Sequence, residues 1–361
     1  MRRIIAVVLL LCMLLTSHTF AADAEREKEI MEKQIVLSYP VFDGEKVWEK
    51  ATVVIENGII TEVTVSDEST ADSRFFLIPG LIDSHTHMGT MAQVETMLQY
   101  GITATCDVSA SAELIAASDR LIIHSSAGMA MGMVLSGKSY VDKAVKNGAK
   151  YIKVLLFSPH SIGKKALCSI VDAAHEKGLK VAVHATEVAT VRQAVEAGGD
   201  VLLHVPMKEP FPEELACAIA DKGIAVAPTL VMMETFAHSG RNGYQPSDYA
   251  NAQAAVHLLH EKGVEILVAT DANPGSFAPG VVYGSSLHRE MKLLVEAGLS
   301  PLEVLQGVTS KNAQAFDLAD IGTIAPGQKA NLILVEGRPD QNITDSMKIV
   351  QIWVDGKPIM E

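Results

Sequence analysis

The middle of the chain alternates between short apolar runs and amphipathic stretches. Eight β/α repeats over roughly 240 residues predict a (β/α)8 TIM barrel. A doubly wound open sheet is the alternative, but no glycine-rich phosphate loop follows the first apolar run. The eight apolar runs are residues 78–84, 102–107, 120–124, 151–156, 180–184, 200–205, 224–227 and 265–270. The clearest helical stretches, each followed by a glycine that is typical of a helix end, are Lys164–Lys177, Val188–Ala197, Pro212–Lys222 and Asp248–Lys262.

Both ends of the chain have a different pattern, which predicts short strands. Within residues 34–65, Asn57-Gly58 separates two apolar runs and is a strong hairpin signal because both residues tolerate positive φ. Near the C-terminus, 331–335 and 349–354 predict two further strands. Neither end has enough apolar surface to fold alone. We therefore expect the two ends to meet in one small β-sandwich, with the barrel inserted between them.

The first residues predict export. Arg2 and Arg3 precede an apolar run over Ile4–Leu15, and small residues at Ala21 and Ala22 offer a cleavage site, which is the layout of a Sec-type signal peptide. No later segment is long and apolar enough for a membrane span. We expect a secreted or periplasmic protein without a membrane span after cleavage. The predicted divisions are a signal peptide at 1–21, a sandwich from 22–76 and 320–361, and a barrel at 77–319.

Charge and cysteine content exclude other classes. The formal net charge is −13, and nucleic-acid binding needs a cationic surface, so we expect no nucleic-acid partner. The cysteines that follow the signal peptide are Cys106, Cys168 and Cys217, an odd and scattered set that predicts free thiols rather than a disulfide framework. The sequence leaves homo-oligomerisation open.

Histidines at predicted strand ends suggest a metal site. His85 and His87 end the first run, and the period-2 geometry of a strand points both side chains to the same side. In a TIM barrel, active groups lie at the carboxyl ends of the strands. Four further chemistry-bearing residues occupy such positions on later runs: Lys153, His184, His204 and Asp271. One histidine at a strand end is more often a core residue than a ligand, but the coincidence favours a shared site.

Lys153 is the most informative of these residues. It lies within an apolar strand, where a charged amine has a large desolvation cost. Its stem can reach the barrel rim and pair with a carboxylate there. Alternatively, the neutral amine takes up CO2 to give a carbamate, whose two oxygens can bridge two metal ions.

The ordered set of site residues resembles that of the amidohydrolase superfamily. Two flanking stretches resemble it too, Pro79–His87 before the site and Ile324–Leu332 after it. The resemblance covers nearly all of the chain after the signal peptide, including the divided sandwich. Within the superfamily the chain is similar to imidazolonepropionase-like and prolidase-like hydrolases. His204-Val205-Pro206 and Pro228-Thr229-Leu230 resemble a bacterial subgroup.

The resemblance implies a binuclear metal hydrolase acting on a small-molecule substrate. The implied ligands suit zinc best. The enzyme's two divalent ions would share a metal-bridging hydroxide that attacks an amide, cyclic amide or dipeptide-like C–N bond. Asp271 would be the catalytic proton shuttle. The implied ligands are His85, His87 and Asp271 for one ion, His184 and His204 for the second, and Lys153, carboxylated by CO2, as the bridge.

Three alternatives stay open at this point. Glu187 follows His184 by three residues, and superfamily members that deaminate purines or pyrimidines use such a glutamate with a single zinc ion. Glu187 also suits the start of a helix, where its charge matches the helix dipole, and a one-metal deaminase would leave Lys153 unexplained. A non-catalytic periplasmic binding protein is a second alternative. Hydrolysis of a phosphotriester or lactone is a third, since it uses the same two-metal chemistry.

Substrate contacts are weakly marked in the sequence. The residues considered for the cleft are His124, Tyr283, His288 and Arg289, the last two more typical of a helix outside the barrel. The segment from Met232 to Asp248 contains glycines and a proline and predicts a mobile loop over the site.

Overall fold

The computed structural model describes residues 34–66, 74–157, 162–275, 278 and 280–359. The predicted signal peptide lies outside the described residues. Within these ranges, no helix has the length and apolar character needed to cross a membrane.

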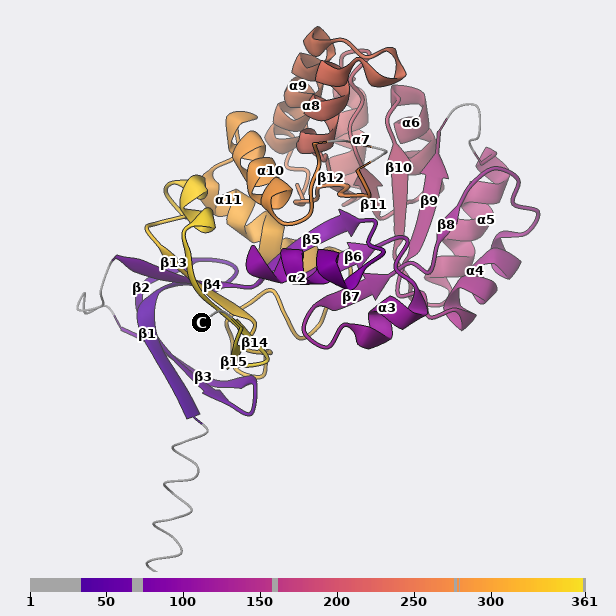
Figure 1. The fold of residues 1–361 in the computed structure, drawn as a ribbon. Helices are drawn as coiled ribbons and strands as arrows, with labels where there is room; N and C mark the ends of the chain where they lie inside the picture. Colours follow the sequence, from indigo (N-terminus) through magenta and orange to yellow (C-terminus); the bar gives the residue numbers. More distant parts are fainter. Residues whose placement is uncertain (1–33, 67–73, 158–161, 276–277, 279, 360–361) are drawn as a thin grey trace, which may run out of the picture.

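Two parallel sheets carry the predicted β/α alternation (Figure 1). The three-stranded sheet has the order β5-β6-β7, and the five-stranded sheet has the order β12-β11-β10-β9-β8. Seven of the eight predicted runs contain strands of these sheets. The strands are β5 (Leu81–Thr86), β6 (Ile102–Asp107), β7 (Ile122–Ser125), β8 (Met129–Ala130), β9 (Ile152–Leu156), β10 (Val181–Ala185), β11 (Val201–Leu203) and β12 (Ala225–Ala227).

The eighth predicted run, 265–270, lies between the two sheets without forming a regular strand. On one side, the Leu267 amide donates to the Val226 carbonyl of β12 at 2.8 Å. On the other side, the Ser84 amide of β5 donates to the Val268 carbonyl at 3.3 Å. The run therefore joins the edge of one parallel sheet to the edge of the other and delivers Asp271 to their carboxyl ends.

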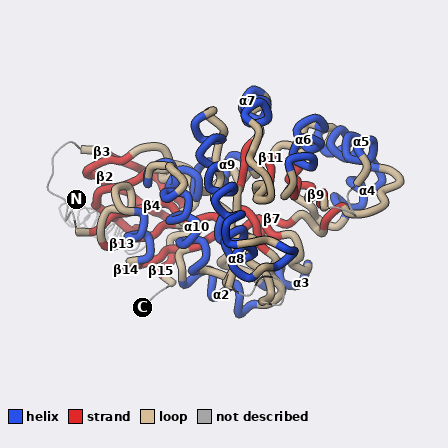
Figure 2. The backbone as a smooth tube through the Cα atoms, turned by 90° about the horizontal axis from the view of Figure 1, so that it is seen from above, coloured by secondary structure: helices blue, strands red, loops and turns tan. Residues whose placement is uncertain are grey.

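Helices cover the outer faces of the parallel sheets, as both views show (Figures 1 and 2). The four clearest predicted helices are present as α5, α6, α7 and α9, and Gly198, after α6, has φ of 82°, which stops the helix in the left-handed region. The α-helices are α2 (Met91–Gln99), α3 (Ala112–Ala117), α4 (Gly137–Lys146), α5 (Lys164–His175), α6 (Val188–Ala197), α7 (Glu213–Asp221), α8 (Leu230–Ser239), α9 (Tyr249–Glu261), α10 (Ser285–Glu296), α11 (Pro301–Gln306) and α12 (Asn312–Ala315). Short helical turns are η1 (Arg241–Gly243), η2 (Pro246–Asp248), η3 (Gly307–Lys311) and η4 (Ile343–Met347).

The two chain ends meet in a mixed sheet, as the sequence predicts. Its seven strands have the order β15-β14-β13-β4-β1-β2-β3, and β4 joins the ends because it pairs with both β1 and β13. The predicted hairpin turn at Asn57-Gly58 links β2 and β3, with φ of 52° and 84°. Where a sandwich of two sheets was expected, the strands are connected as one sheet. They are β1 (Gln34–Phe42), β2 (Val47–Glu56), β3 (Ile59–Val65), β4 (Phe75–Pro79), β13 (Leu332–Glu336), β14 (Ile349–Val354) and β15 (Lys357–Pro358).

The first predicted run, 78–84, is divided between two sheets at Gly80. Pro79 ends β4 in the mixed sheet, and Leu81 begins β5 in the parallel sheet. A side chain at Gly80 would collide with Thr103, since an added Cβ would lie 2.2 Å from its Oγ1. The expectation of one continuous strand was wrong because an apolar run does not reveal that the chain changes its hydrogen-bonding partners. One residue thus couples the mixed sheet to the strand that carries His85.

Candidate metal centre

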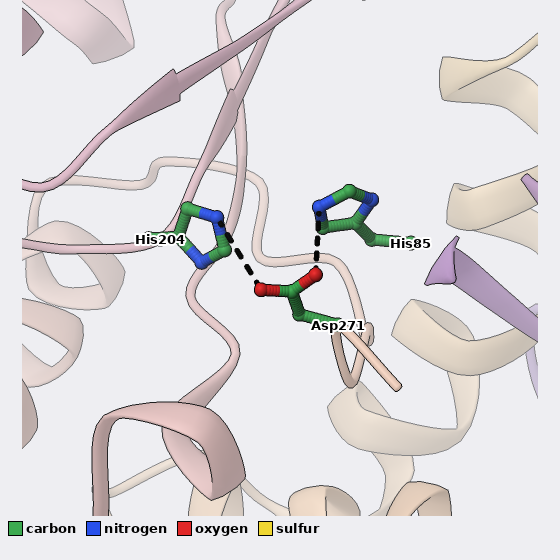
Figure 3. A group of neighbouring side chains, drawn as sticks. All are labelled: His85, His204 and Asp271. Atoms are coloured by element: carbon green, nitrogen blue, oxygen red, sulfur yellow. Dashed lines mark ion pairs between the residues drawn. The ribbon is translucent and has the colours of Figure 1, made fainter. Parts of the chain in front are cut away.

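Asp271 lies between three of the predicted histidines. Its Oδ1 is 3.3 Å from His85 Nε2 and 3.1 Å from His87 Nε2. Its Oδ2 is 3.9 Å from His204 Nε2, so the carboxylate faces rings from both sides (Figure 3). The ligand atoms of His85, His204 and Asp271 all lie within 4.8 Å of one another. This spacing allows three donors from different parts of the fold to share one cation.

Lys153 and His184 adjoin this group. Lys153 Nζ is 3.3 Å from His85 Nε2, and the ring of His184 stands edge-on to that of His204 with centroids 4.3 Å apart. The structure therefore brings all six predicted residues together, with Lys153 contributed from the start of β9 rather than from its carboxyl end. A cavity of about 390 Å³ opens on this group and is lined by five of them: His85, His87, Lys153, His184 and Asp271.

Burial favours the uncharged forms of the basic groups. It lowers the pKa values of His85, His184 and His204 well below their usual range, and neighbouring basic groups act in the same direction. Burial also lowers the pKa of Lys153 to about 7, although the charge of Asp271 opposes the shift. An uncharged imidazole has a lone pair to offer, so the electrostatics favour ligand forms.

Two buried ring nitrogens support a cation at this place. Nε2 of His184 and Nε2 of His204 have no hydrogen-bond partner among the described residues. A buried polar atom without a partner is costly unless something else satisfies it. Imidazole nitrogens beside a carboxylate are the donors that zinc and similar ions prefer. The residues present therefore fit a divalent metal ion.

Three residues of the centre have left-handed backbone conformations. The φ angles are 74° at His204, 51° at Thr229 and 59° at Asp271. Such conformations cost on the order of 1–3 kcal/mol each and persist where the surroundings fix them, often at functional sites. Thr229 is the most unusual because its side chain is β-branched. The fold thus accepts strain to aim these side chains.

Hydroxyl groups orient two of the histidines from outside the cluster. Thr229 Oγ1 is 2.7 Å from Nδ1 of His204, and Ser109 Oγ is 3.2 Å from Nδ1 of His87. Each contact leaves Nε2 to face the centre. Thr229 precedes α8, whose first amides donate to the buried Glu290 carboxylate from α10, at 2.8 Å from Leu230 and 2.6 Å from Val231. A hydrogen-bonded chain therefore links α10 to the orientation of His204.

Two buried carboxylates that the sequence analysis did not single out brace the histidine strand. Asp83 accepts hydrogen bonds from the Thr270 hydroxyl at 2.6 Å and the Thr270 amide at 3.0 Å, so it ties β5 to the segment that carries Asp271. Burial raises the pKa of Asp83 to about 7. Asp107 accepts from the Thr86 hydroxyl at 2.7 Å and the Met88 amide at 2.6 Å. Asp83 lies within the Pro79–His87 stretch, two residues before His85.

Glu187 lies at the edge of the site in a structural role. It is exposed and precedes α6, and its amide donates to the Thr190 hydroxyl at 3.2 Å. It does not line the cavity at the centre. This position agrees with the start of a helix, the simpler of its two interpretations.

Most of the residues considered for substrate contact lie elsewhere. His124 stacks on Tyr151, with parallel rings 5.9 Å apart, and Arg289 on α10 pairs with Glu234. Tyr283 comes nearest, since its hydroxyl donates to the His87 carbonyl at 2.5 Å. The segment 232–248, expected as a loop, is largely helical because it contains most of α8 together with η1 and η2.

His288 is buried against the mixed-sheet end of the chain. Its Nε2 donates to the Tyr100 carbonyl at 3.0 Å, so in the neutral ring Nδ1 accepts from the Ser346 hydroxyl at 2.9 Å. It lies on α10, in agreement with the prediction of a helix for this stretch, and it lines neither cavity at the centre. Burial lowers its pKa to about 4. His288 therefore acts as a neutral structural linker.

This linker predicts a measurable loss of stability in acid. An unfolded histidine has a pKa near 6.5, so between pH 6.5 and 4 the unfolded chain binds a proton that folded His288 does not. The free energy of unfolding should fall by up to about 3 kcal/mol across this window from this group alone. Denaturant titrations at several pH values should show that the difference in free energy of unfolding between the native protein and the His288→Gln variant becomes smaller as the pH falls. A constant difference would contradict the assignment.

The sequence is similar to those of curated hydrolases. An imidazolonepropionase of Ruegeria pomeroyi is 29% identical over 178 residues, covering 49% of this chain and 39% of that protein. The chain thus spans about two fifths of the length of the first curated relatives it matches. An imidazolonepropionase of Treponema denticola is 24% identical over 397 aligned positions, covering 86% of this chain and 92% of that protein.

Solved structures share the fold. A Xaa-Pro dipeptidase with bound methionine superposes with a TM-score of 0.77 at 19% identity, covering 91% of this chain and all of that one. A putative prolidase from Bifidobacterium longum gives a TM-score of 0.75 at 21% identity, covering 91% of this chain and 95% of that one. The model of the amidohydrolase family matches residues 76–359, which include every residue of the centre. The chain belongs to the amidohydrolase family.

Proposed function

We propose that this protein is an exported, binuclear metal-dependent hydrolase that cleaves an amide, cyclic amide or dipeptide-like C–N bond. One observation carries the proposal: Nε2 of His184 and Nε2 of His204, which lack hydrogen-bond partners among the described residues, share a buried cluster with Asp271 and Lys153. Family membership and relatives described as imidazolonepropionases support the class of reaction.

The residues divide into two sets of ligands around a bridge. His85, His87 and Asp271 would hold one ion, and His184 and His204 the second, with zinc the best match to these donors. Lys153 would bridge them after its neutral amine attacks CO2, which forms an N–C bond and releases one proton. Its burial and its pKa near 7 support that chemistry. When bound, such ions polarise a carbonyl group and lower the pKa of water.

Asp271 is the proposed proton carrier. Its oxygens face the histidine cluster, and the residue lines the cavity from which a substrate would approach. From there it accepts the proton of the attacking water and returns it to the leaving nitrogen, so the amine departs neutral. The left-handed backbone at Asp271 keeps the carboxylate aimed at this place.

The geometry favours this function over the alternatives. A one-metal deaminase would need Glu187 at the reacting atoms, yet this side chain is exposed and outside the cavity. A binding protein without catalysis has no use for a buried lysine beside a histidine cluster.

We also propose that the two parallel sheets form the eight-stranded barrel expected from the sequence. Hydrogen bonds from segment 265–270 to both β12 and β5 support closure on one side. On the other side, the Lys150 amide before β9 donates to the Ser125 carbonyl of β7 at 2.8 Å. The N-terminal pattern supports export. The mass of the protein isolated from cells would test this, because export should remove the signal peptide.

Loss of the Thr229 hydroxyl should weaken metal binding. Thr229→Val keeps the shape but removes the group 2.7 Å from His204 Nδ1, and loss of such an outer contact typically lowers metal affinity 10- to 100-fold. Thr229→Ser keeps the hydroxyl and should stay close to the native affinity. Competition with a chromophoric chelator measures both, and equal affinities of the valine and serine variants would contradict the role.

Hydrolysis itself is tested with a panel of N-acyl amino acids, dipeptides and cyclic amides. We expect turnover that a chelator abolishes and added zinc restores. Activity that survives complete metal removal would contradict the proposal, as would a preference for deaminating aromatic amines.

A further inference from the structure

A second recess adjoins the metal centre, and we call it the apolar annex. Its volume is about 290 Å³. An apolar wall is formed by Leu155, Phe157, Met232, Met233 and Phe236, and polar groups of Thr186, Arg241, Asn242 and Tyr244 complete the lining. The wall thus combines the end of β9 with one face of α8. The annex is partly open to the outside, so it is a recess that a ligand can enter rather than a packing void of the core.

The annex and the central cavity meet at the reacting groups. Both are lined by Leu155, His184 and Asp271, and the annex also reaches His204. A substrate whose scissile bond lies beside Asp271 can therefore extend one arm into the central cavity and the other into the annex. The ring of Phe157 stands edge-on to His184, with centroids 6.3 Å apart, so the wall begins directly at the centre.

The wall is anchored to the same elements that orient the ligands. Met232 and Met233 lie in the first turn of α8, which directly follows Thr229 and is fixed by the Glu290 carboxylate. The apolar surface and the His204 ring are therefore positioned together. Methionine side chains adapt to irregular shapes, which suits a pocket for aryl or alkyl groups alike.

We propose that the annex binds a bulky apolar group of the substrate, of about ten non-hydrogen atoms, so that the preferred substrates are amides with an aryl-alkyl or medium-length alkyl arm. A cavity of roughly 150 Å³ accommodates benzene, and the annex has nearly twice that volume. The inference rests on the proposed function for the reaction, but the binding that it predicts does not depend on turnover.

Two uncleavable ketones test the inference in the zinc-loaded full-length mature protein. 5-Phenylpentan-2-one and pentan-2-one share a carbonyl and differ by a phenyl group, which is large enough to need the annex. Burial of that group should tighten binding about 10- to 100-fold by calorimetry or ligand-observed NMR. Equal affinities for the two ketones would overturn the proposal.

Variants locate the effect. Met233→Trp fills the annex and should reduce the ratio of the two affinities to below threefold; Phe236→Trp fills it from the next turn and serves if the first variant does not fold. Val231→Ala is the matched control, because Val231 is buried on the same helix but does not line the annex, and it should keep the native ratio. A ratio that survives both filling variants would also overturn the proposal.

The outcomes separate this inference from the proposed function. A phenyl preference without hydrolysis of any amide keeps the annex and rejects the hydrolase. Hydrolysis of small amides without a phenyl preference keeps the hydrolase and rejects the annex.

Discussion

Lys153→Ala should lose bridged metal and at least about 1,000-fold in amide hydrolysis, because the several kcal/mol that a two-metal site contributes to the transition state depend on the bridge. The side chain is almost fully buried beside His85, so its removal leaves a gap at the centre rather than at the surface. Short carboxylic acids such as acetate or propionate should occupy that gap and restore part of the activity. Metal content and rate, each with and without the acid, are the measurements.

The matched control is Lys150→Ala, three residues earlier. Lys150 is exposed and lies just before β9. Its alanine variant should keep both the metal content and the rate of amide hydrolysis. A Lys153→Ala protein that is fully metallated and active would contradict the binuclear proposal. Loss of activity with no response to any carboxylic acid would contradict the bridging role in particular.

Asp271→Asn should keep the fold and lose about 10²- to 10⁴-fold in kcat, which is the range for removing a proton-transfer group. Asparagine is nearly isosteric and tolerates the left-handed backbone, φ of 59°, that this position requires. The expected loss therefore reports chemistry rather than backbone strain. Steady-state kinetics on the metal-loaded variant, with thermal unfolding as the check on folding, measure it.

Asp317→Asn provides the comparison for this substitution. Asp317 has the same left-handed conformation, with φ of 54°, but is exposed and does not line the central cavity. Its variant should be indistinguishable from the native enzyme. An Asp271→Asn enzyme with native kcat would contradict the proton-carrier role.

Local patterns explain why the grouping of these side chains could be predicted from the sequence. Period-2 projection puts His85 and His87 on one side, and the carboxyl ends of neighbouring parallel strands meet at one edge of a sheet. Lys153, on an apolar strand, was therefore expected beside ligands from other strands. The 3.3 Å contact between Lys153 Nζ and His85 Nε2 places it there.

Long-range contacts explain what the sequence could not predict. The hydrogen bond that the Thr270 hydroxyl donates to Asp83 joins residues 187 positions apart, and no local pattern encodes it. The contact of Thr229 with His204 depends on a left-handed residue that is β-branched, against its own propensity. Segment 265–270 has the composition of a strand, but its hydrogen bonds are shared between two sheets, so it forms no regular ladder.

The prediction of a loop over residues 232–248 was wrong for its first part. Glycine and proline in this segment predicted a loop, yet the first part continues α8, whose N-terminus is held by Glu290 from α10. The breakers all lie after this helix: Gly240 ends α8 with φ of 67°, and Gly243 and Pro246 lie in the short turns η1 and η2. The contact with Glu290 also positions the apolar wall of the annex, which periodicity alone did not reveal.

Metal content per chain tests the central claim most directly. The mature protein, purified without chelator and supplied with zinc and bicarbonate, should contain close to two equivalents by elemental analysis. One equivalent that does not rise with further zinc would contradict the Lys153-bridged site and favour a one-metal enzyme. No bound metal after repeated supplementation would contradict the metal centre altogether.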